Sequence, residues 1–349
     1  MNNGVQGISG YQGPAGGWGA VKAVTASVFS QKAVARDIIA MFRMNQVKGF
    51  DCPGCAWPDP SHRTPMELCE NGVKAVSWET TSKKASPAFF RQHTVAELWN
   101  YSDYALENIG RLTHPMKYDR ASDTWQAVEW QVAFAEIGER LRSYDSPKRV
   151  EFYTSGRTSN EAAFLYQLFA REYGSSNFPD CSNMCHGPTS AGLTQAIGMG
   201  KGTVELEDFE HCDLVICIGH NPGTNHPRML TTLREVAQRG ARIISINPLA
   251  ERGLERFSFP QSPTDMLKGQ STVLSHDYYQ VKMGGDASLL KGVMKALIEM
   301  DEARILLGQE PCLDRAFLAE HTHGYQELYD SLHRCSWSDL EQDSGLTRS

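Results

Sequence analysis

The sequence predicts an α/β protein in which a parallel sheet is covered by helices on both faces, preceded by a smaller β-rich domain. Three observations support this prediction. Short apolar strands alternate with helical segments after residue 149, each of these strands ends at Gly, Asn or Pro, and a Pro-rich segment with two closely spaced cysteines comes earlier. Alternating apolar strands and helices are typical of a parallel sheet buried on both faces.

Composition describes an ordinary globular protein and excludes some classes of function. The chain has 349 residues, of which 41% are hydrophobic and 21% charged, and this length suggests roughly two or three domains. Its formal net charge of −7 offers no basic field, so no nucleic-acid partner is expected. No apolar stretch reaches transmembrane length, and no export signal is visible. Nine cysteines in such a chain predict a cytoplasmic location and metal binding or catalysis rather than disulfides.

Two domains are predicted in the first 110 residues. Residues 1–48 are expected to form a flexible Gly-rich arm followed by a helix at 33–44. Residues 49–110 are expected to form the β-rich domain, because Asn71-Gly72 is a strong hairpin-turn signal that leads into alternating residues at 73–78. The prolines of 50–65 break any periodicity, so something other than packing is expected to hold this loop.

The third predicted domain, 111–349, follows the order strand, Gly-rich turn, helix. Its expected elements are strands at 149–156, 212–219, 241–248 and 278–283, with helices at 159–173 and 229–239. Ligands of such sheets bind at the carboxyl ends of the strands.

Cys52 and Cys55 form a C-x-x-C pair, whose spacing lets two thiolates bind one metal or form a redox disulfide. A thioredoxin-type pair would open a helix after a strand, whereas this pair lies in a Pro-rich loop. Metal or iron–sulfur ligation is therefore favoured. Cys69 is either a third ligand or a buried structural thiol. Other possible ligands are Asp51, Asp59 and His62.

Cys185 and His186 precede Gly187, Pro188 and a helix that is expected to start at Thr189. A thiol at the positive end of a helix and beside an acid–base group is favoured as the thiolate. The same pair is also compatible with a core cysteine next to a solvated histidine.

Several loops are candidates for phosphate binding. Residues 155–160 follow a strand and open a helix, which would aim backbone N–H groups at an anion and add a cationic Arg. Similar turns occur at 219–222, 247–248 and 284–286. One such loop is an ordinary turn signal, whereas several in order at strand ends favour one large phosphorylated ligand.

Together these passages resemble the amino-terminal part of molybdopterin oxidoreductases of the formate dehydrogenase alpha-subunit type. The resemblance covers most of 49–349 and rests on GRLTHPM, TSGRTSNEAAFL, NMCHGPTSAGL, ELEDFEHCDLVICIGHNPGTNHPRM, GARIISINP and LDRAFLAEHTHGYQEL. NMCHGPTSAGL is the most specific of them. The insert at 258–279 is similar to that of the soluble branch linked to acid resistance. The implied fold is an iron–sulfur domain followed by Rossmann-like parallel-sheet domains that bind molybdopterin guanine dinucleotide.

The resemblance implies a two-electron oxidation of formate to carbon dioxide. Its cofactors would be molybdenum bis(molybdopterin guanine dinucleotide) and a 4Fe-4S cluster. Cys185 would bind molybdenum and His186 would accept a proton, while Cys52 and Cys55 would bind the cluster and Lys83 would lie between cluster and pterin. The implied dinucleotide contacts are Gly156, Arg157, Asn160, Asn221, Asn247, Gly285 and Asp286.

The sequence also departs from the family pattern. Asp59 and Thr81 stand where fully equipped relatives carry the third and fourth cysteines of the cluster. Family members continue well beyond residue 349, so this chain alone is not expected to turn over. An electron-acceptor protein is the expected partner. The alternatives are a molybdenum enzyme acting on another small substrate and a non-catalytic scaffold of the same fold.

Overall fold

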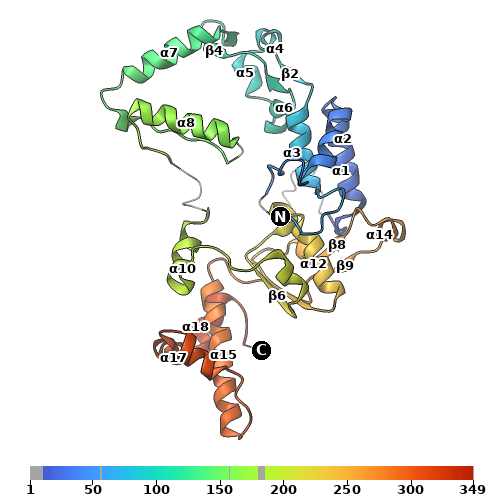
Figure 1. Ribbon diagram of the computed structural model, residues 1–349, viewed down its shortest axis with the longest axis vertical. Coiled ribbons are helices and arrows are strands. Elements are labelled where there is room, and N and C mark those ends of the chain that lie inside the picture. Colours follow the sequence, from blue (N-terminus) through green and yellow to red (C-terminus); the bar gives the residue numbers. More distant parts are fainter. Residues whose placement is uncertain (1–10, 56, 157, 180–184, 349) are drawn as a thin grey trace, which may run out of the picture. The chain divides into compact units, whose positions relative to one another are not determined.

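The computed structural model describes residues 11–55, 57–156, 158–179 and 185–348, and the chain divides into two compact units. Residues 24–206 form the first, which we call the CxxC unit. Residues 1–23 and 207–349 form the second, which we call the sheet unit. Figure 1 shows the order of the elements along the chain. The boundary between the units lies within α1 (Gly17–Ser30), so part of the segment expected as a flexible arm is helical.

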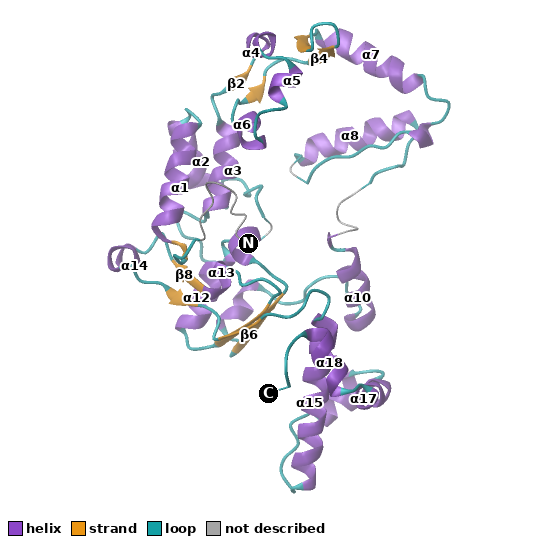
Figure 2. Cartoon of the chain, turned by 180° about the vertical axis from the view of Figure 1, so that it is seen from behind, coloured by secondary structure: helices purple, strands orange, loops and turns teal. Residues whose placement is uncertain are grey.

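Three helices form the core of the CxxC unit. The second half of α1, α2 (Val34–Arg43) and α3 (Glu70–Thr80) lie side by side in both ribbon views (Figures 1 and 2). Between them lies a buried cluster of Val28, Met44, Val73 and Val76. Full burial of one such side chain stabilises the fold by about 1.5–3 kcal/mol. The expected helix at 33–44 is confirmed as α2.

The strand expected at 73–78 is wrong, because these residues lie in the middle of α3. Val73 and Val76 are three positions apart, which in a helix places both on the face that packs against the cluster. Asn71 and Gly72 lie in the first turn of this helix rather than in a hairpin. Within the described part of 49–110 the sole strand is the two-residue β2 (Lys84–Ala85), so the expected β-rich domain is mainly helical.

The rest of the described CxxC unit contains helices and short strands. They are α4 (Pro87–Gln92), α5 (Val95–Leu98), α6 (Asp103–Glu107), β3 (Arg111–Leu112) parallel to β2, a hairpin of β4 (Met116–Asp119) and β5 (Thr124–Ala127), α7 (Trp130–Arg142), η1 (Pro147–Arg149), α8 (Asn160–Tyr173) and α10 (Gly187–Ile197).

Residues 149–156 do not form the expected strand. The structure has η1 at their start and an extended loop after it, in which Phe152 is 4% exposed. The ring of Phe152 packs against the aromatic rings of Tyr166, Phe169 and Tyr173 on α8. The expected helix at 159–173 is confirmed as α8, and the Ser159 side chain caps it by accepting a hydrogen bond from Ala162 N at 3.3 Å.

A three-stranded parallel sheet forms the centre of the sheet unit, in the order β10 (Asp277–Tyr279), β7 (Arg242–Ile246), β6 (Leu214–Ile218). The helix α12 (Met229–Gln238) follows β6 and buries Leu230, Leu233 and Val236. These elements confirm the strands expected within 212–219 and 241–248 and the helix expected at 229–239. The short helices α11 (Pro222–Asn225) and α13 (Arg252–Glu255) follow the strand ends.

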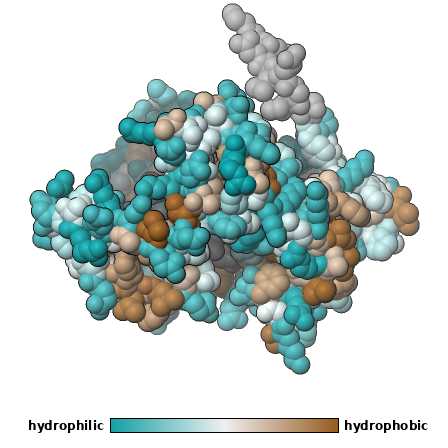
Figure 3. Space-filling view, turned by 90° about the horizontal axis from the view of Figure 1, so that it is seen from above, coloured by the Kyte–Doolittle hydropathy of each residue, from teal (hydrophilic) through white to brown (hydrophobic). Residues whose placement is uncertain are grey.

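The sheet is not covered on both faces along β6. Leu214, Ile216 and Ile218 are 47%, 51% and 40% exposed, whereas Cys217 between them is buried. The prediction that helices cover both faces of the sheet is therefore confirmed for one face of β6. For the other face of this strand it is wrong in the described structure. Figure 3 shows hydrophobic side chains among hydrophilic ones at the surface.

A second sheet brings the start of the chain to the sheet unit. Its order is β1 (Ala15–Gly16), β8 (Arg256–Ser258), β9 (Thr272–Val273), and β1 runs parallel to β8. Gly16 has φ +77°, and a Cβ there would lie 2.4 Å from the Ser258 carbonyl oxygen. This close approach requires glycine. The helix α14 (Pro263–Lys268) lies between β8 and β9 in the sequence.

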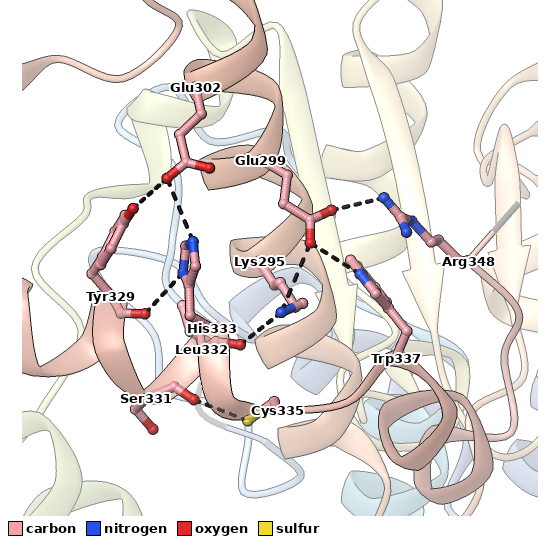
Figure 4. A network of polar contacts seen from close by, with 10 residues as sticks. All are labelled: Lys295, Glu299, Glu302, Tyr329, Ser331, Leu332, His333, Cys335, Trp337 and Arg348. Atoms are coloured by element: carbon pink, nitrogen blue, oxygen red, sulfur yellow. Dashed lines mark hydrogen bonds and ion pairs between the residues drawn. The ribbon is translucent and has the colours of Figure 1, made fainter.

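Four helices end the described chain, α15 (Asp286–Leu306), α16 (Arg315–His321), α17 (Tyr325–Arg334) and α18 (Trp337–Ser344). A polar network joins three of them (Figure 4). Lys295 Nζ donates to the Leu332 carbonyl oxygen at 2.9 Å. Trp337 Nε1 and Arg348 Nη2 both donate to Glu299, at 3.0 and 2.7 Å. Because the buried Lys295 is paired in this way, the network serves to hold the helices together.

Across the described helices, none has both the length and the apolarity that a bilayer crossing requires.

Candidate functional site

Asn45 holds the loop of Cys52 against the segment that precedes Cys69. The Cys52 backbone N–H donates to Asn45 Oδ1 at 2.8 Å, and Asn45 Nδ2 donates to the Glu67 carbonyl oxygen at 2.6 Å. Asn45 is 4% exposed and has φ +56°, a left-handed conformation that Asn tolerates better than most residues. A single buried side chain thus connects two loops that are distant in sequence.

The sulfur atoms of Cys52 and Cys69 lie above the same glycine. A Cβ on Gly72 would stand 2.9 Å from Cys52 Sγ, 3.3 Å from Met44 Sδ and 3.6 Å from Cys69 Sγ. No side chain fits at this position without displacing a sulfur atom. Gly72 therefore forms a cradle at the start of α3, against which two thiols and the Met44 sulfur pack closely.

Backbone N–H groups donate to both sulfurs. Gly54 N lies 3.3 Å from Cys52 Sγ, and Gly72 N lies 3.3 Å from Cys69 Sγ, so Cys69 caps α3. Burial, opposed by the hydrogen bond from Gly72 N and helped by negative charge on Cys52 and Cys55, raises the pKa of the Cys69 thiol to about 11. Cys52 and Cys55 therefore both lie close enough to Cys69 for their charges to act on its thiol.

The described part of this group contains no site for a single metal ion. Among the described residues, no three His, Cys, Asp or Glu side chains stand ready to hold one metal ion. Ligands of a tetrahedral zinc at 2.3 Å would lie about 3.8 Å from one another. An iron–sulfur cluster binds each thiolate to a different iron, so its cysteines stand farther apart. Thiolates are the donors that hold such a cluster, so the three cysteines of this group fit it.

The other candidate ligands in this region lie outside the sulfur group. Asp59 pairs with Arg63 at 3.2 Å, and both Asp51 and His62 are exposed.

Lys83 lies beyond the far end of α3. Its ammonium group donates to Asn108 Oδ1 at 2.5 Å, and burial together with the nearby charge of Lys32 lowers its pKa. The eleven residues of α3 rise about 16 Å between Cys69 and this end of the helix. The structure therefore does not bring Lys83 next to the cysteines, and its catalytic role stays a prediction. Its neighbour Lys84 is exposed.

Cys185 and His186 lie at the start of α10, where His186 is the N-cap residue and Pro188 lies in the first turn. This helix starts two residues before the expected Thr189. Both side chains are exposed. The second interpretation of the sequence, in which Cys185 is a core cysteine, is therefore wrong. The Cys185 thiol is accessible at a helix N-terminus.

Asn221 and Asn247 meet at the carboxyl ends of β6 and β7. Asn247 Nδ2 donates to Asn221 Oδ1 and to the His220 carbonyl oxygen, the latter at 3.3 Å. Asn247 Oδ1 accepts from Leu249 N at 3.2 Å. The structure thus brings these two expected contacts together, and it uses the amide of the buried Asn247 to join the strand ends.

Four other expected dinucleotide contacts can be described by their own surroundings. Gly156 has open space where a Cβ would be, and Asn160 is exposed at the start of α8. Arg157 lies outside the described residues. Gly285 packs tightly, because a Cβ there would lie 2.6 Å from the Asp343 carbonyl oxygen, so its small size has a packing reason. Asp286 is half-buried as the first residue of α15.

Sequence reasoning missed two features near these sites. The sequence carries only a weak indication of the role of Asn45, because Asn just after a helix often adopts the left-handed conformation. His220 and His226 lie on either side of the short helix α11 in the sequence, and their ring nitrogens are 3.0 Å apart. Burial and the neighbouring His226 lower the pKa of His220.

Comparison with known proteins identifies a family model that matches this chain. The model of the family described as molybdopterin oxidoreductase matches residues 111–299, more than half of the chain. The chain is 60% identical to Protein YdeP of Escherichia coli strain K12 over 98% of its own length and 45% of that protein. It thus spans less than half the length of this relative.

Two further relatives carry the word oxidoreductase or dehydrogenase in their names. The chain is 45% identical to Uncharacterized oxidoreductase Rv2900c of Mycobacterium tuberculosis, over 87% of this chain and 39% of that protein. It is 29% identical to the F420-dependent formate dehydrogenase 1 subunit alpha of Methanococcus maripaludis, over 75% of this chain and 35% of that one.

Proposed function

Because the chain belongs to the molybdopterin oxidoreductase family, we propose that it is part of a molybdenum enzyme that oxidises formate to carbon dioxide. The observation that carries the proposal is the exposed Cys185 thiol at the start of α10. A soft sulfur ligand suits molybdenum. The name of the methanogen relative supports formate as the substrate.

The reaction converts HCOO⁻ into CO2, one proton and two electrons. Molybdenum bis(molybdopterin guanine dinucleotide), when bound, supplies the acceptor for the two electrons. Cys185 would bind the metal, and the exposed ring of His186, its immediate neighbour, would take the proton on a ring nitrogen. The electrons would then leave through an iron–sulfur cluster, with Cys52 and Cys55 as two of its ligands, to an acceptor protein.

The dinucleotide would lie on strand-end and helix-start residues. Gly156, Arg157 and Asn160 would bind phosphate through backbone N–H groups and the guanidinium group. Asn221 and Asn247 would shape the ends of β6 and β7, where ligands of parallel sheets bind. The carboxylate of Asp286 accepts hydrogen bonds, so it suits the N–H groups of a guanine rather than a phosphate. Gly285 would let the chain turn into α15 beside it.

We also propose a cytoplasmic location, because the eight described cysteines are all free thiols.

The test uses the full-length protein, purified without oxygen. We expect bound molybdenum and pterin, formate-dependent reduction of a dye, and a fall to background activity in Cys185→Ala. Cys312→Ala, which removes another exposed thiol, is the matched control and should keep full activity. Equal activity in Cys185→Ala and wild type would remove Cys185 from the mechanism.

Two other results separate the alternatives. Molybdenum without formate-dependent activity would favour another small substrate. Absence of molybdenum and pterin would leave the non-catalytic scaffold.

A further inference from the structure

We propose that Cys69 is the third sulfur ligand of the iron–sulfur cluster that Cys52 and Cys55 bind. The inference rests on the proposed function only for the presence of a cluster. In the family pattern the third cysteine would stand at the position of Asp59. We infer that Cys69, from a different loop, provides the third sulfur ligand in its place.

The first support is the Asn45 clamp. One amide side chain bonds the backbone of Cys52 itself and the Glu67 carbonyl oxygen, two residues before Cys69. Each bond fixes one of the two loops to the end of α2. A buried amide whose donor and acceptor are both used orders its surroundings, because leaving either unsatisfied costs about 1–3 kcal/mol. The distance between the two loops is thus set before any cluster binds.

The second support is the close approach of two sulfur atoms to Gly72. Cys52 Sγ and Cys69 Sγ lie 2.9 and 3.6 Å from the point where a Cβ of this residue would be. Gly54 likewise has Cys52 Sγ 3.3 Å from its own missing Cβ. Glycines at both places let backbone approach the sulfurs closely, as the inorganic core of a cluster requires.

The third support is the surroundings of the sulfurs. Gly54 N and Gly72 N point at sulfur, and Gly72 lies in the first turn of α3, where the helix dipole favours negative charge. On its other side Cys52 packs against the apolar cluster of Val28, Met44, Val73 and Val76. Hydrogen bonds to sulfur and burial are the two features by which a protein tunes a cluster.

Substitution of Cys69 by Ser separates ligation from folding. Serine is among the preferred N-cap residues, so Cys69→Ser keeps the cap of α3 and removes the thiolate. Cys52→Ser is the positive control. Cys335→Ser is the matched control, since Cys335 is also half-buried at a helix end and donates from its sulfur to the Ser331 carbonyl oxygen at 3.3 Å.

The readouts are iron, acid-labile sulfide and molybdenum per chain, with electron paramagnetic resonance of the reduced protein. In Cys69→Ser and Cys52→Ser we expect iron and sulfide to fall about tenfold, since loss of an outer-shell partner alone costs 10–100-fold in metal affinity. Cys335→Ser should match wild type, and molybdenum should stay bound in all variants.

Wild-type iron, sulfide and spectrum in Cys69→Ser would overturn the assignment, as would a wild-type protein without iron. Iron that depends on Cys69 in a protein without molybdenum would support this inference and reject the proposed enzyme. The two proposals thus fail independently.

Discussion

Gly72→Ala tests whether the start of α3 is shaped around sulfur atoms. In most helices this change is favourable, because Ala is about 1 kcal/mol better than Gly in a helix interior. At Gly72 the new methyl group would meet Cys52 Sγ at 2.9 Å and Met44 Sδ at 3.3 Å, and Met44 is fully buried. Overpacking of this kind costs about 1–3 kcal/mol. We therefore expect a net loss of stability where helix propensity alone predicts a gain.

Gly192→Ala is the matched control in the same unit. Gly192 lies in the interior of α10, is exposed, and has no atom within 4 Å of an added Cβ. There the same substitution should raise the free energy of unfolding by about 0.5–1 kcal/mol. Urea denaturation of both variants, followed by circular dichroism, measures the difference, which should be about 1–3 kcal/mol, because the gain in helix propensity is common to both. Equal or greater stability of Gly72→Ala relative to wild type would refute the cradle.

Two further changes test other buried polar groups. Asn45→Ala removes both bonds of the clamp and leaves Ala at φ +56°, so the free energy of unfolding in urea should fall by about 2–4 kcal/mol; Asn45→Gly, which avoids the strain, should lose less, and an Ala variant as stable as wild type would contradict the clamp. Asp301 accepts hydrogen bonds from Leu313 N and Arg315, which lower its pKa to about 2. The ionised carboxylate of Asp301 stabilises the fold at a pH above 3.8, the ordinary pKa of Asp. This contribution to stability is lost as the pH falls through about 2. Acid titration of Asp301→Asn should show a smaller loss over that range, and identical curves would exclude the effect.

Helices and strands that follow a regular apolar spacing were predicted well from the sequence. Elements that were predicted from a local turn signal were not. The strands β6 and β7 and the helices α8 and α12 lie close to their expected positions, because apolar runs and helix spacing are properties of a single segment. At Asn71-Gly72 and at 149–156 the local signal was overridden by packing. Val73 turns toward the cluster of α1 and α2, and the Phe152 ring packs against α8.

For the candidate sites too, features that depend on nearby residues were predictable and features that depend on distant contacts were not. The spacing of Cys52 and Cys55 and the strand-end positions of Asn221 and Asn247 were readable, since each depends on nearby residues or on a rule of parallel sheets. The role of Cys69 stayed open, because it depends on a bond from Asn45 to a loop more than twenty residues later. No pattern in a single sequence indicates such a bond.

The pairing of β1 with β8 affects how the chain is synthesised. Ala15 and Gly16 pair with Phe257 and Ser258, so the first strand leaves the ribosome long before its partner exists. At about 5–20 residues per second, the intervening 240 or so residues take roughly 10–50 s to translate. Most of the CxxC unit can fold during that wait, whereas the sheet unit can close only late in translation. A nascent chain stalled before residue 256 would carry an unpaired β1, which limited proteolysis of ribosome-bound chains could detect.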